Sequence, residues 1–315
     1  MNISKTYIFK LRYIIPDFVV ISFGSVLILG FIRWFFFLEY PILEIKEEVW
    51  NFWIPVIFPW IPNYFWFGHK FKFLTFKKDI EKRRFSFQLI IWFAMGIMLI
   101  FSQHYLTTTT GKLLTVKNVK EIQKHDRVRY YRITDFAVHK FIGGVQTHFR
   151  VSGKWNSDLN ITIYFVNPIL THKTQHIVTT PAYWYGVKFH KRISNLGSNA
   201  KKERKYQAFF KECVTKMEKY DYHKLDHFEC KPASVDRENF RTAIQFATRA
   251  NVKNDVMVLE PVFEPYEKRD GHKLAWMFGS FIIGLAILML TLIKPALMEN
   301  EELNAVPDFS GPNEN

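Results

Sequence analysis

Histidine and cysteine are the residue types in this sequence with the clearest capacity for metal chemistry. Two histidine pairs have a spacing of four residues: His172/His176 and His223/His227. On a helix, this spacing puts both imidazoles on one face, as a zinc site requires, and Cys230 follows the second pair. No H-E-x-x-H motif and no paired C-x-x-C accompany either pair. The sequence therefore predicts no cofactor and favours scattered surface histidines, with zinc held by His223, His227 and Cys230 as the alternative.

Nucleophilic catalysis has almost no support in the sequence. No G-x-S triplet occurs, which excludes both a nucleophile elbow and the serine motif of intramembrane proteases. The phosphate-binding patterns of a P-loop and of a dinucleotide fold are also missing. Cys213 and Cys230 either pair in an oxidising compartment or remain buried thiols. The sequence thus favours a protein that binds over one that catalyses.

The elements that position these residues begin with four apolar segments: 18–38, 50–67, 85–102 and 274–293. Each is close to the length that crosses about 30 Å of hydrocarbon as a helix. The first carries one charge, Arg33, whose long side chain we expect to reach the interface. The second contains three prolines and forms either a kinked span or a segment that enters the membrane and returns. On the fourth, Ser280 and Gly284 predict close helix packing, within the chain in preference to a partner.

The charges of the loops predict the orientation. Basic residues precede the first segment, the 39–49 loop is acidic, and the 68–84 loop is basic. Because cytoplasmic loops carry an excess of Lys and Arg, the N-terminus (1–17) and the 68–84 loop are predicted to be cytoplasmic. All four segments then cross, the 103–272 region is extracytoplasmic, and an acidic, disordered tail (295–315) lies inside. If the proline-rich segment does not cross, the 103–272 region is cytoplasmic instead.

The 103–272 region is long enough for one compact domain. β-Branched and aromatic residues predict strands at 127–135, 145–152, 159–166, 184–191 and 255–263. Two amphipathic helices are predicted over 199–222 and 234–249, the second with Ser234 as its N-cap. The fold class is therefore a membrane protein with about four transmembrane helices and one extramembrane α+β domain inserted between the third and fourth.

The net charge of the chain is +14, and its distribution bears on possible partners. Residues 111–271 contain 29 Lys and Arg against 17 Asp and Glu. The densest basic run, in 201–216, falls on the polar face of a predicted helix, where a solvated surface is the default. An extracytoplasmic position disfavours nucleic acid, so anionic lipid headgroups or an acidic partner are the interpretation that this charge favours.

Several motifs give the chain a family resemblance. They are Trp50–Pro62 (WNFWIPVIFPWIP), His104–Lys112 (HYLTTTTGK), Arg150–Lys154 (RVSGK), Gly186–Ser194 (GVKFHKRIS) and Asp270–Phe281 (DGHKLAWMFGSF). In this order they resemble the membrane-anchored N-terminal region that precedes the peptidase core in some Bacteroidetes rhomboid-family intramembrane serine proteases. The resemblance extends to about Ile293 and includes neither the G-x-S-G serine nor the second-helix histidine, so no catalytic residue carries over. It implies a stand-alone accessory region that recognises something without cutting it.

Together these observations predict a non-enzymatic integral protein of the bacterial inner membrane. Its extracytoplasmic domain would serve as a scaffold or binding subunit of a membrane complex, with other membrane protein subunits as partners. Eight Trp and Phe residues in 50–67, together with backbone groups freed by prolines, favour packing against protein there. The alternatives are a membrane-anchored hydrolase or metal-dependent enzyme, or a regulator of an intramembrane protease.

Overall fold

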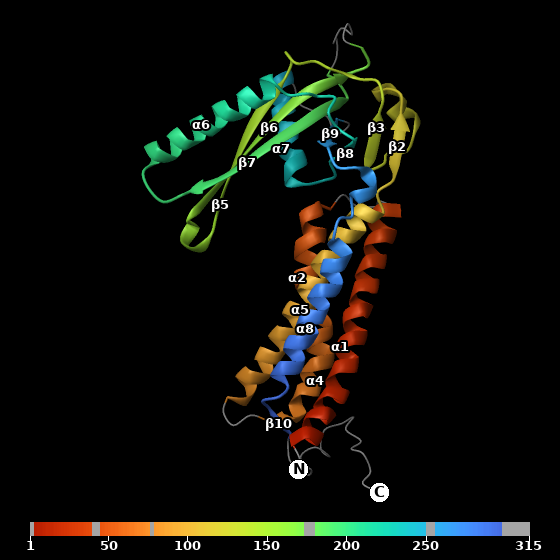
Figure 1. Cartoon of the computed structure of the whole chain (residues 1–315), viewed down its shortest axis with the longest axis vertical. Helices are drawn as coiled ribbons and strands as arrows, with labels where there is room; N and C mark the ends of the chain where they lie inside the picture. The colour runs from red at the N-terminus through yellow and green to blue at the C-terminus, as the bar shows by residue number, and fades with distance from the viewer. Residues whose placement is uncertain (1–2, 40–44, 76–78, 173–179, 250–255, 298–315) are drawn as a thin grey trace. The chain divides into compact units, whose positions relative to one another are not determined.

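The structure is a computed structural model that describes residues 3–39, 45–75, 79–172, 180–249 and 256–297. The chain divides into two compact units, whose elements are labelled in Figure 1. The helical unit comprises Met1–Thr109 and Asp270–Asn315, and the sheet unit comprises Thr110–Arg269. Among the described residues, three helices are long and apolar enough to cross a membrane: Thr6–Phe36, Ile80–Thr109 and Tyr266–Thr291. Apolar helices and a mixed sheet unit are compatible with a membrane anchor that carries an α+β domain.

The helical unit contains three long helices and one broken segment. The long helices are α1 (Ile3–Arg33), α5 (Ile80–Thr109) and α8 (Lys273–Thr291). α1 continues directly into the π-helical η1 (Trp34–Glu39). The broken segment consists of η2 (Val49–Trp53), α2 (Ile54–Ile57), α3 (Trp60–Pro62), η3 (Asn63–Phe67), α4 (Gly68–Lys70) and η4 (Phe71–Phe73). β1 (Leu74–Thr75) then pairs with β10 (Ala296–Leu297).

One prediction about the chain ends needs correction. Residues 1–17 stay predicted as a cytoplasmic N-terminus, and the structure adds that α1 is already helical from Ile3. The tail was predicted to be disordered from residue 295, but Ala296 and Leu297 pair with β1. Residues after 297 lie outside the described part of the chain.

The broken segment follows α5 in the opposite direction. Its prolines lie at or next to the boundaries between its pieces, because a proline has no amide N–H to continue a helix. Near its start, Asn51 Oδ1 accepts a hydrogen bond from the Thr107 hydroxyl of α5 at 3.1 Å. Near its end, Asn63 Nδ2 donates to the Gln88 carbonyl of α5 at 2.7 Å. The segment is therefore kinked and passes along α5 without turning back.

α1 and α8 also pack in opposite directions. The buried Lys10 amine of α1 donates to the Leu292 carbonyl just beyond α8 at 2.5 Å. Farther along, the rings of Phe18 and Phe281 stack with their centroids 5.7 Å apart. α1, the broken segment, α5 and α8 thus form four helical passes that alternate in direction.

The Ser280/Gly284 step predicted close packing, and the structure confirms it within the chain. A Cβ atom added at Gly284 would lie 2.5 Å from the Cβ of Ala94 in α5, so only glycine permits this approach of the two helices. Ser280 Oγ donates to the carbonyl of Met277 in its own helix at 2.8 Å. Of these two small residues, Gly284 therefore serves the contact with α5.

The sheet unit is organised around one mixed sheet. Its strands are β2 (Leu113–Val116), β3 (Tyr130–Ile133), β4 (Ala137–Val138), β5 (Gly144–Ser152), β6 (Asp158–Leu170), β7 (Tyr183–Ser194), β8 (His227–Cys230) and β9 (Met257–Val262). The order is β2-β3-β8-β9-β7-β6-β4, and β5 also pairs with β6. The β2–β3 and β7–β9 pairs are parallel, and the others are antiparallel. All five predicted strands are confirmed, whereas β2, β4 and β8 were not anticipated.

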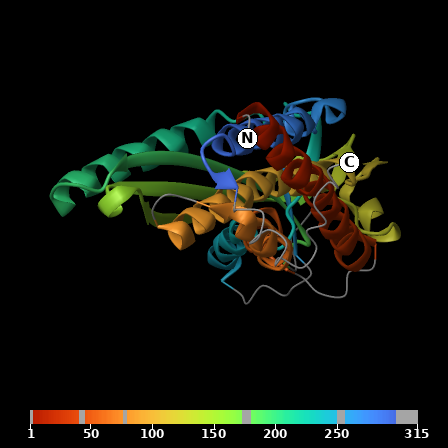
Figure 2. The same cartoon turned by 90° about the horizontal axis from the view of Figure 1, so that it is seen from below.

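Two helices cover opposite faces of this sheet, and short 3₁₀ turns complete the unit: η5 (Val119–Lys124), η6 (Lys154–Asn156) and η7 (Tyr266–Lys268). α6 (Asn199–Glu218) lies along one face of β6 and β7, as Figures 1 and 2 show, and buries Phe209 and Cys213 there. α7 (Val235–Thr248) covers part of the other face with Phe240 and Ala243. A Cβ atom at Gly144 would lie 1.8 Å from the Ala243 carbonyl oxygen, so this contact requires glycine. The predicted cap is confirmed, since Ser234 Oγ accepts from the third amide of the first turn.

Candidate functional site

The structure does not bring the predicted metal ligands together. His227 and Cys230 lie on β8, where successive side chains alternate, and they therefore face opposite sides of the sheet. Cys230 belongs to the core under α6. His223 lies outside β8, with its ring centroid 4.8 Å from that of Phe136. No cluster of three or more His, Cys, Asp or Glu suited to a metal ion occurs among the described residues, and His176 of the other pair is not among them.

The cysteines are two separate buried thiols. Both are free, so they do not form the disulfide that was one of the two alternatives. Burial raises the pKa of the Cys213 thiol to about 11. A thiol with a raised pKa has little thiolate near neutral pH and is a poor nucleophile. Cys213 is therefore a core residue.

His227 is buried on the face of the sheet opposite Cys230. Its Nδ1 lies 2.9 Å from Asp226 Oδ2, and its ring packs edge-on against Tyr130 and Tyr266. Asp226 also accepts a hydrogen bond from Arg132 at 2.8 Å. Burial opposes ionisation, but these hydrogen bonds hold the pKa of Asp226 below its usual value. The Asp226–His227 pair thus joins β8 to β3 and to the chain leading into α8.

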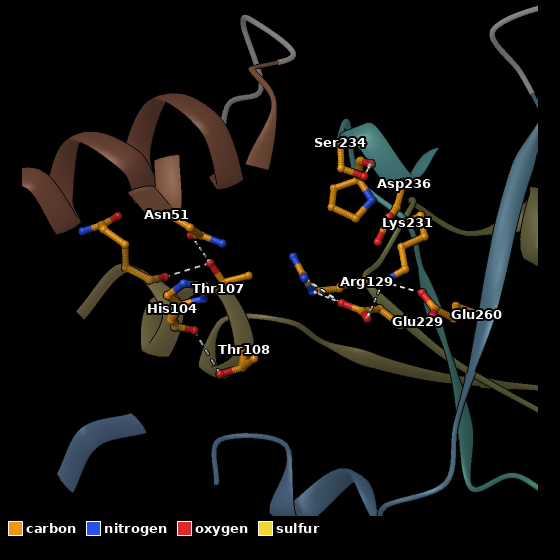
Figure 3. Close-up of polar contacts among 12 residues, drawn as sticks. Asn51, His104, Thr107, Thr108, Arg129, Glu229, Lys231, Ser234, Asp236 and Glu260 are labelled. Atoms are coloured by element: carbon orange, nitrogen blue, oxygen red, sulfur yellow. Dashed lines mark hydrogen bonds and ion pairs between the residues drawn. The ribbon is translucent and has the colours of Figure 1, made fainter. Parts of the chain in front are cut away.

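A row of alternating charges crosses the same face of the sheet, and we call it the charge ladder. In order its members are Arg129, Glu229, Lys231, Glu260, Lys188 and Asp236, with Tyr164 bonded to Asp236. The nitrogen–oxygen distances are 2.6 Å from Arg129 to Glu229, 3.3 Å from Lys231 to Glu229 and 2.6 Å from Lys231 to Glu260. Figure 3 shows these four side chains in sequence. Each inner charge therefore lies between two charges of opposite sign.

In the charge ladder the pKa of Glu229 is lowered and the pKa of Lys231 is raised, so both values lie farther from neutral pH than usual. Burial works against the charged forms, but Lys231 and Arg129 hold the pKa of Glu229 below its usual value. Glu229 and Glu260 likewise raise the pKa of Lys231 despite its burial. A general acid or base needs a pKa near the working pH. These groups are fixed charges at neutral pH, so the ladder has the properties of a structural network that joins β3, β8, β9, β7 and α7.

The helical unit contains a second buried polar group, which we call the polar centre: Arg33, Asn51, Gln103 and Thr107. Arg33 Nη1 donates to Asn51 Oδ1 at 2.8 Å and to the Gln103 carbonyl at 3.0 Å. The Thr107 hydroxyl donates to the same Asn51 oxygen, a contact visible in Figure 3. All four side chains are at most 7 % exposed.

The polar centre corrects the expectation for Arg33. Its guanidinium does not extend away from the protein but is 5 % exposed and bonded within it. It also lies over the Trp50 ring, 5.7 Å from the centroid. The wide π-helical turn η2 buries the consecutive residues Trp50 and Asn51 together. A π-helical turn is a frequent mark of functional sites, and here it provides partners for a buried cation.

Comparison with known proteins leaves the family open. The chain matches no family model, no curated protein and no solved structure. The resemblance to the rhomboid accessory region therefore stays a prediction.

Sequence reasoning missed both networks for a definable reason. Lys188, Glu229 and Glu260 lie on three different strands, β7, β8 and β9, and only the strand order brings them together. The partners of Arg33 come from segments 18 and 70 residues away. Asn51 inside one apolar segment and Gln103 directly after another were the available sign of such a centre.

Proposed function

We propose that this protein is an integral membrane protein of the bacterial inner membrane that holds its α+β sheet unit outside the cytoplasm, as a scaffold or binding subunit of a membrane complex. The observation that carries the proposal is the insertion of the sheet unit between two apolar helices. Its two connections leave the helical unit side by side, since Thr109 Oγ1 donates to Asp270 Oδ1 at 3.0 Å. Two chain connections that leave the helical unit next to one another suit a domain displayed on one side of a membrane.

Four crossings are the arrangement that we infer for the helical unit. The broken segment passes along α5, and backbone groups in a membrane need partners. Trp92 Nε1 of α5 donates to the Val56 carbonyl at 2.7 Å, which supports the segment where its helix is interrupted. With four crossings, the N- and C-termini and the basic 68–84 loop are cytoplasmic, as the excess of Lys and Arg favours.

A binding role is supported by the chemistry of the polar networks. The charge ladder holds fixed, mutually compensating charges, and Cys213 is a thiol of raised pKa. The polar centre consists of an arginine, two amides and a hydroxyl, none of which is a base at neutral pH. A membrane-anchored hydrolase or metal-dependent enzyme is the rival proposal, and a regulator of an intramembrane protease is the version that the family resemblance favours.

The surface that we assign to other membrane subunits is the outer side of the broken segment. Its exposed aromatic side chains are Phe52, Trp53, Tyr64, Phe65 and Trp66, between 49 % and 72 % exposed. Aromatic belts at an interface account for part of this set. Internal contacts such as Trp92–Val56 already serve the backbone, so the proposal rests on the side chains and not on unpaired backbone groups.

The experiment is purification in mild detergent at native expression level, comparing the wild type with two triple variants. Tyr64→Ala with Phe65→Ala and Trp66→Ala removes the aromatic surface. Val20→Ala with Leu27→Ala and Ile28→Ala is the matched control, because these α1 side chains are equally exposed and apolar. We expect a discrete complex of constant composition for the wild type and the control, and a lone chain for the aromatic variant. A monodisperse lone chain for the wild type contradicts the proposal.

A further inference from the structure

Near the turn η6, the strands β5, β6 and β7 carry basic side chains in register. Arg150, Asn160 and Arg192 lie side by side across the three strands. The next row toward α7 consists of His148, Thr162 and His190. Directly opposite residues on neighbouring strands have Cβ atoms about 5 Å apart. The two rows therefore form one compact patch, which we call the basic rows.

The basic rows lie on the face opposite α6. In the same strands Phe149, Ile161 and Ile163 alternate with them and point toward the α6 side, where Tyr206 packs on Phe149. The other face is covered by α7 only at its near end, where Tyr164 contacts Phe240. Beyond that contact, Arg150, His190 and Arg192 are exposed. This leaves the rows open to a ligand.

The charge of the basic rows is weakly compensated, in contrast to the charge ladder beside them. The guanidinium of Arg150 forms no ion pair with any residue that the structure describes. Arg192 has Asp158 at 3.9 Å, and its side chain remains 69 % exposed. Lys188, which precedes His190 on the same face of β7, is already engaged by Asp236 and Glu260. The compensated charges of the ladder thus extend along β7 to Lys188, and the weakly compensated Arg192 of the basic rows follows it on the same strand.

The turn η6 between β5 and β6 presents a tryptophan. Trp155 is 87 % exposed and has a left-handed backbone (φ 61°, ψ 30°), which is uncommon for a bulky residue. The residue after β7 holds the turn, because Asn195 Nδ2 donates to the Asn156 carbonyl at 2.8 Å. Leu196, 67 % exposed, follows on that side. A strained conformation that exposes an indole is an observation that points to a contact.

We infer that the basic rows and Trp155 form one surface that docks on anionic phospholipid headgroups at a bilayer. Arginine and histidine attract headgroup phosphates, and tryptophan favours the depth at which the headgroups lie. The inference rests on the proposed membrane anchoring, which keeps a bilayer within reach of the sheet unit. β6, with 13 residues, gives this arm a length of about 40 Å. Headgroups fit a flat face better than an acidic peptide does, because peptide-binding sites need alternating pockets.

The test uses the full chain in nanodiscs of neutral lipid, mixed with vesicles that are either neutral or contain anionic phospholipid. Flotation measures how much protein follows each vesicle. Wild-type protein should float with anionic vesicles only, and Arg150→Glu with Arg192→Glu should lower this binding by at least about tenfold. The control is Lys120→Glu with Lys124→Glu. It makes the same change of charge at two exposed positions of η5 and should leave vesicle binding unchanged.

A second measurement reports on the tip directly. A Trp155→Cys variant can be labelled selectively with an environment-sensitive dye, because Cys213 and Cys230 are buried. Its emission should shift to the blue with anionic vesicles, and the arginine double variant should abolish the shift. The inference is overturned if the arginine variant and its control float equally with anionic vesicles. It is also overturned if the basic rows bind acidic protein and not the vesicles. Failure of the anchoring proposal is distinguishable, because such a chain would not enter nanodiscs.

Discussion

The polar centre and the charge ladder are both networks of polar side chains, but they neutralise charge in different ways. The ladder alternates cations with carboxylates, and its side chains are partly exposed, for example 14 % for Lys231 and 18 % for Glu229. In the polar centre, Arg33 donates to amide and carbonyl oxygens and is 5 % exposed. The first solution suits a surface near water, and the second suits an apolar bundle, where each lost hydrogen bond exposes a polar group to hydrocarbon.

The difference teaches where each unit is sensitive. In the ladder a lost member leaves neighbours that solvent can reach and screen. In the polar centre the loss of Arg33 removes the donor to the Gln103 side-chain oxygen and one of the two donors to Asn51, and both acceptors are buried. Mutations should therefore separate the two networks by size of effect and by response to pH.

Arg33→Ala should have the largest effect, with a loss of about 3 kcal/mol in the free energy of unfolding of the helical unit, because buried acceptors lose their donor. Thermal unfolding in detergent can be followed through a thiol placed at the buried Met98, in a chain whose two cysteines are replaced by alanine. Arg83→Ala, at an exposed position, is the control. A change of less than about 0.5 kcal/mol for Arg33→Ala would mean that the centre does not stabilise the bundle.

Glu229→Ala should destabilise the sheet unit by about 2 kcal/mol, because Arg129 and Lys231 lose their shared carboxylate. The native Cys213 and Cys230 are a suitable probe, since both are buried in this unit and react only when it opens. Glu203→Ala, at an exposed position of α6, is the matched control. Equal thiol reactivity in the two variants would remove the ladder from the account.

Acid should weaken the sheet unit by on the order of 1 kcal/mol. The pKa values of Glu229 and Asp236 are lowered in the folded protein. Their contribution is therefore present above the unfolded pKa of about 4 and is lost as pH falls through the lower folded pKa. The members of the polar centre do not titrate in this window, so the Met98 probe should show no corresponding loss. Glu229→Gln should reduce the acid sensitivity of the sheet unit, and an unchanged pH profile would contradict this assignment.

Lys216→Ala should have the smallest effect. Lys216 pairs with Glu212 on α6 at 2.7 Å, but both side chains are about half exposed, and solvent screens such pairs. The thiol-reactivity midpoint of the sheet unit should be the same as that of the wild type within error. A clear loss would show that surface pairs matter here as much as the ladder does.

The features that sequence reasoning predicted are those with local causes. The start of α7 followed from the side-chain chemistry of Ser234, and the long apolar helices followed from hydropathy over about 20 residues. Close packing at Gly284 followed from the small side chains of α8, and the structure adds its partner, Ala94 of α5. In each case the decisive residues lie within a few turns of one another.

The features that it missed depend on contacts between distant segments. β8 has only four residues, too few for a period, and its His227 and Cys230 were taken as neighbours when they face opposite sides. Lys10 was counted among the basic residues before the first span, but it is buried and donates to Leu292. Arg33 was expected at the interface because its partners could not be seen in the sequence.

Cysteine accessibility in intact cells tests the central claim most directly, namely that the helical unit crosses four times and holds the sheet unit outside. Lys154→Cys places a thiol at the exposed tip of the sheet unit, and Lys82→Cys places one at the exposed start of α5. The native cysteines are buried and give a low background. A membrane-impermeant maleimide should modify position 154 in intact cells and position 82 only after lysis. Modification of position 82 but not position 154 in intact cells would contradict the account.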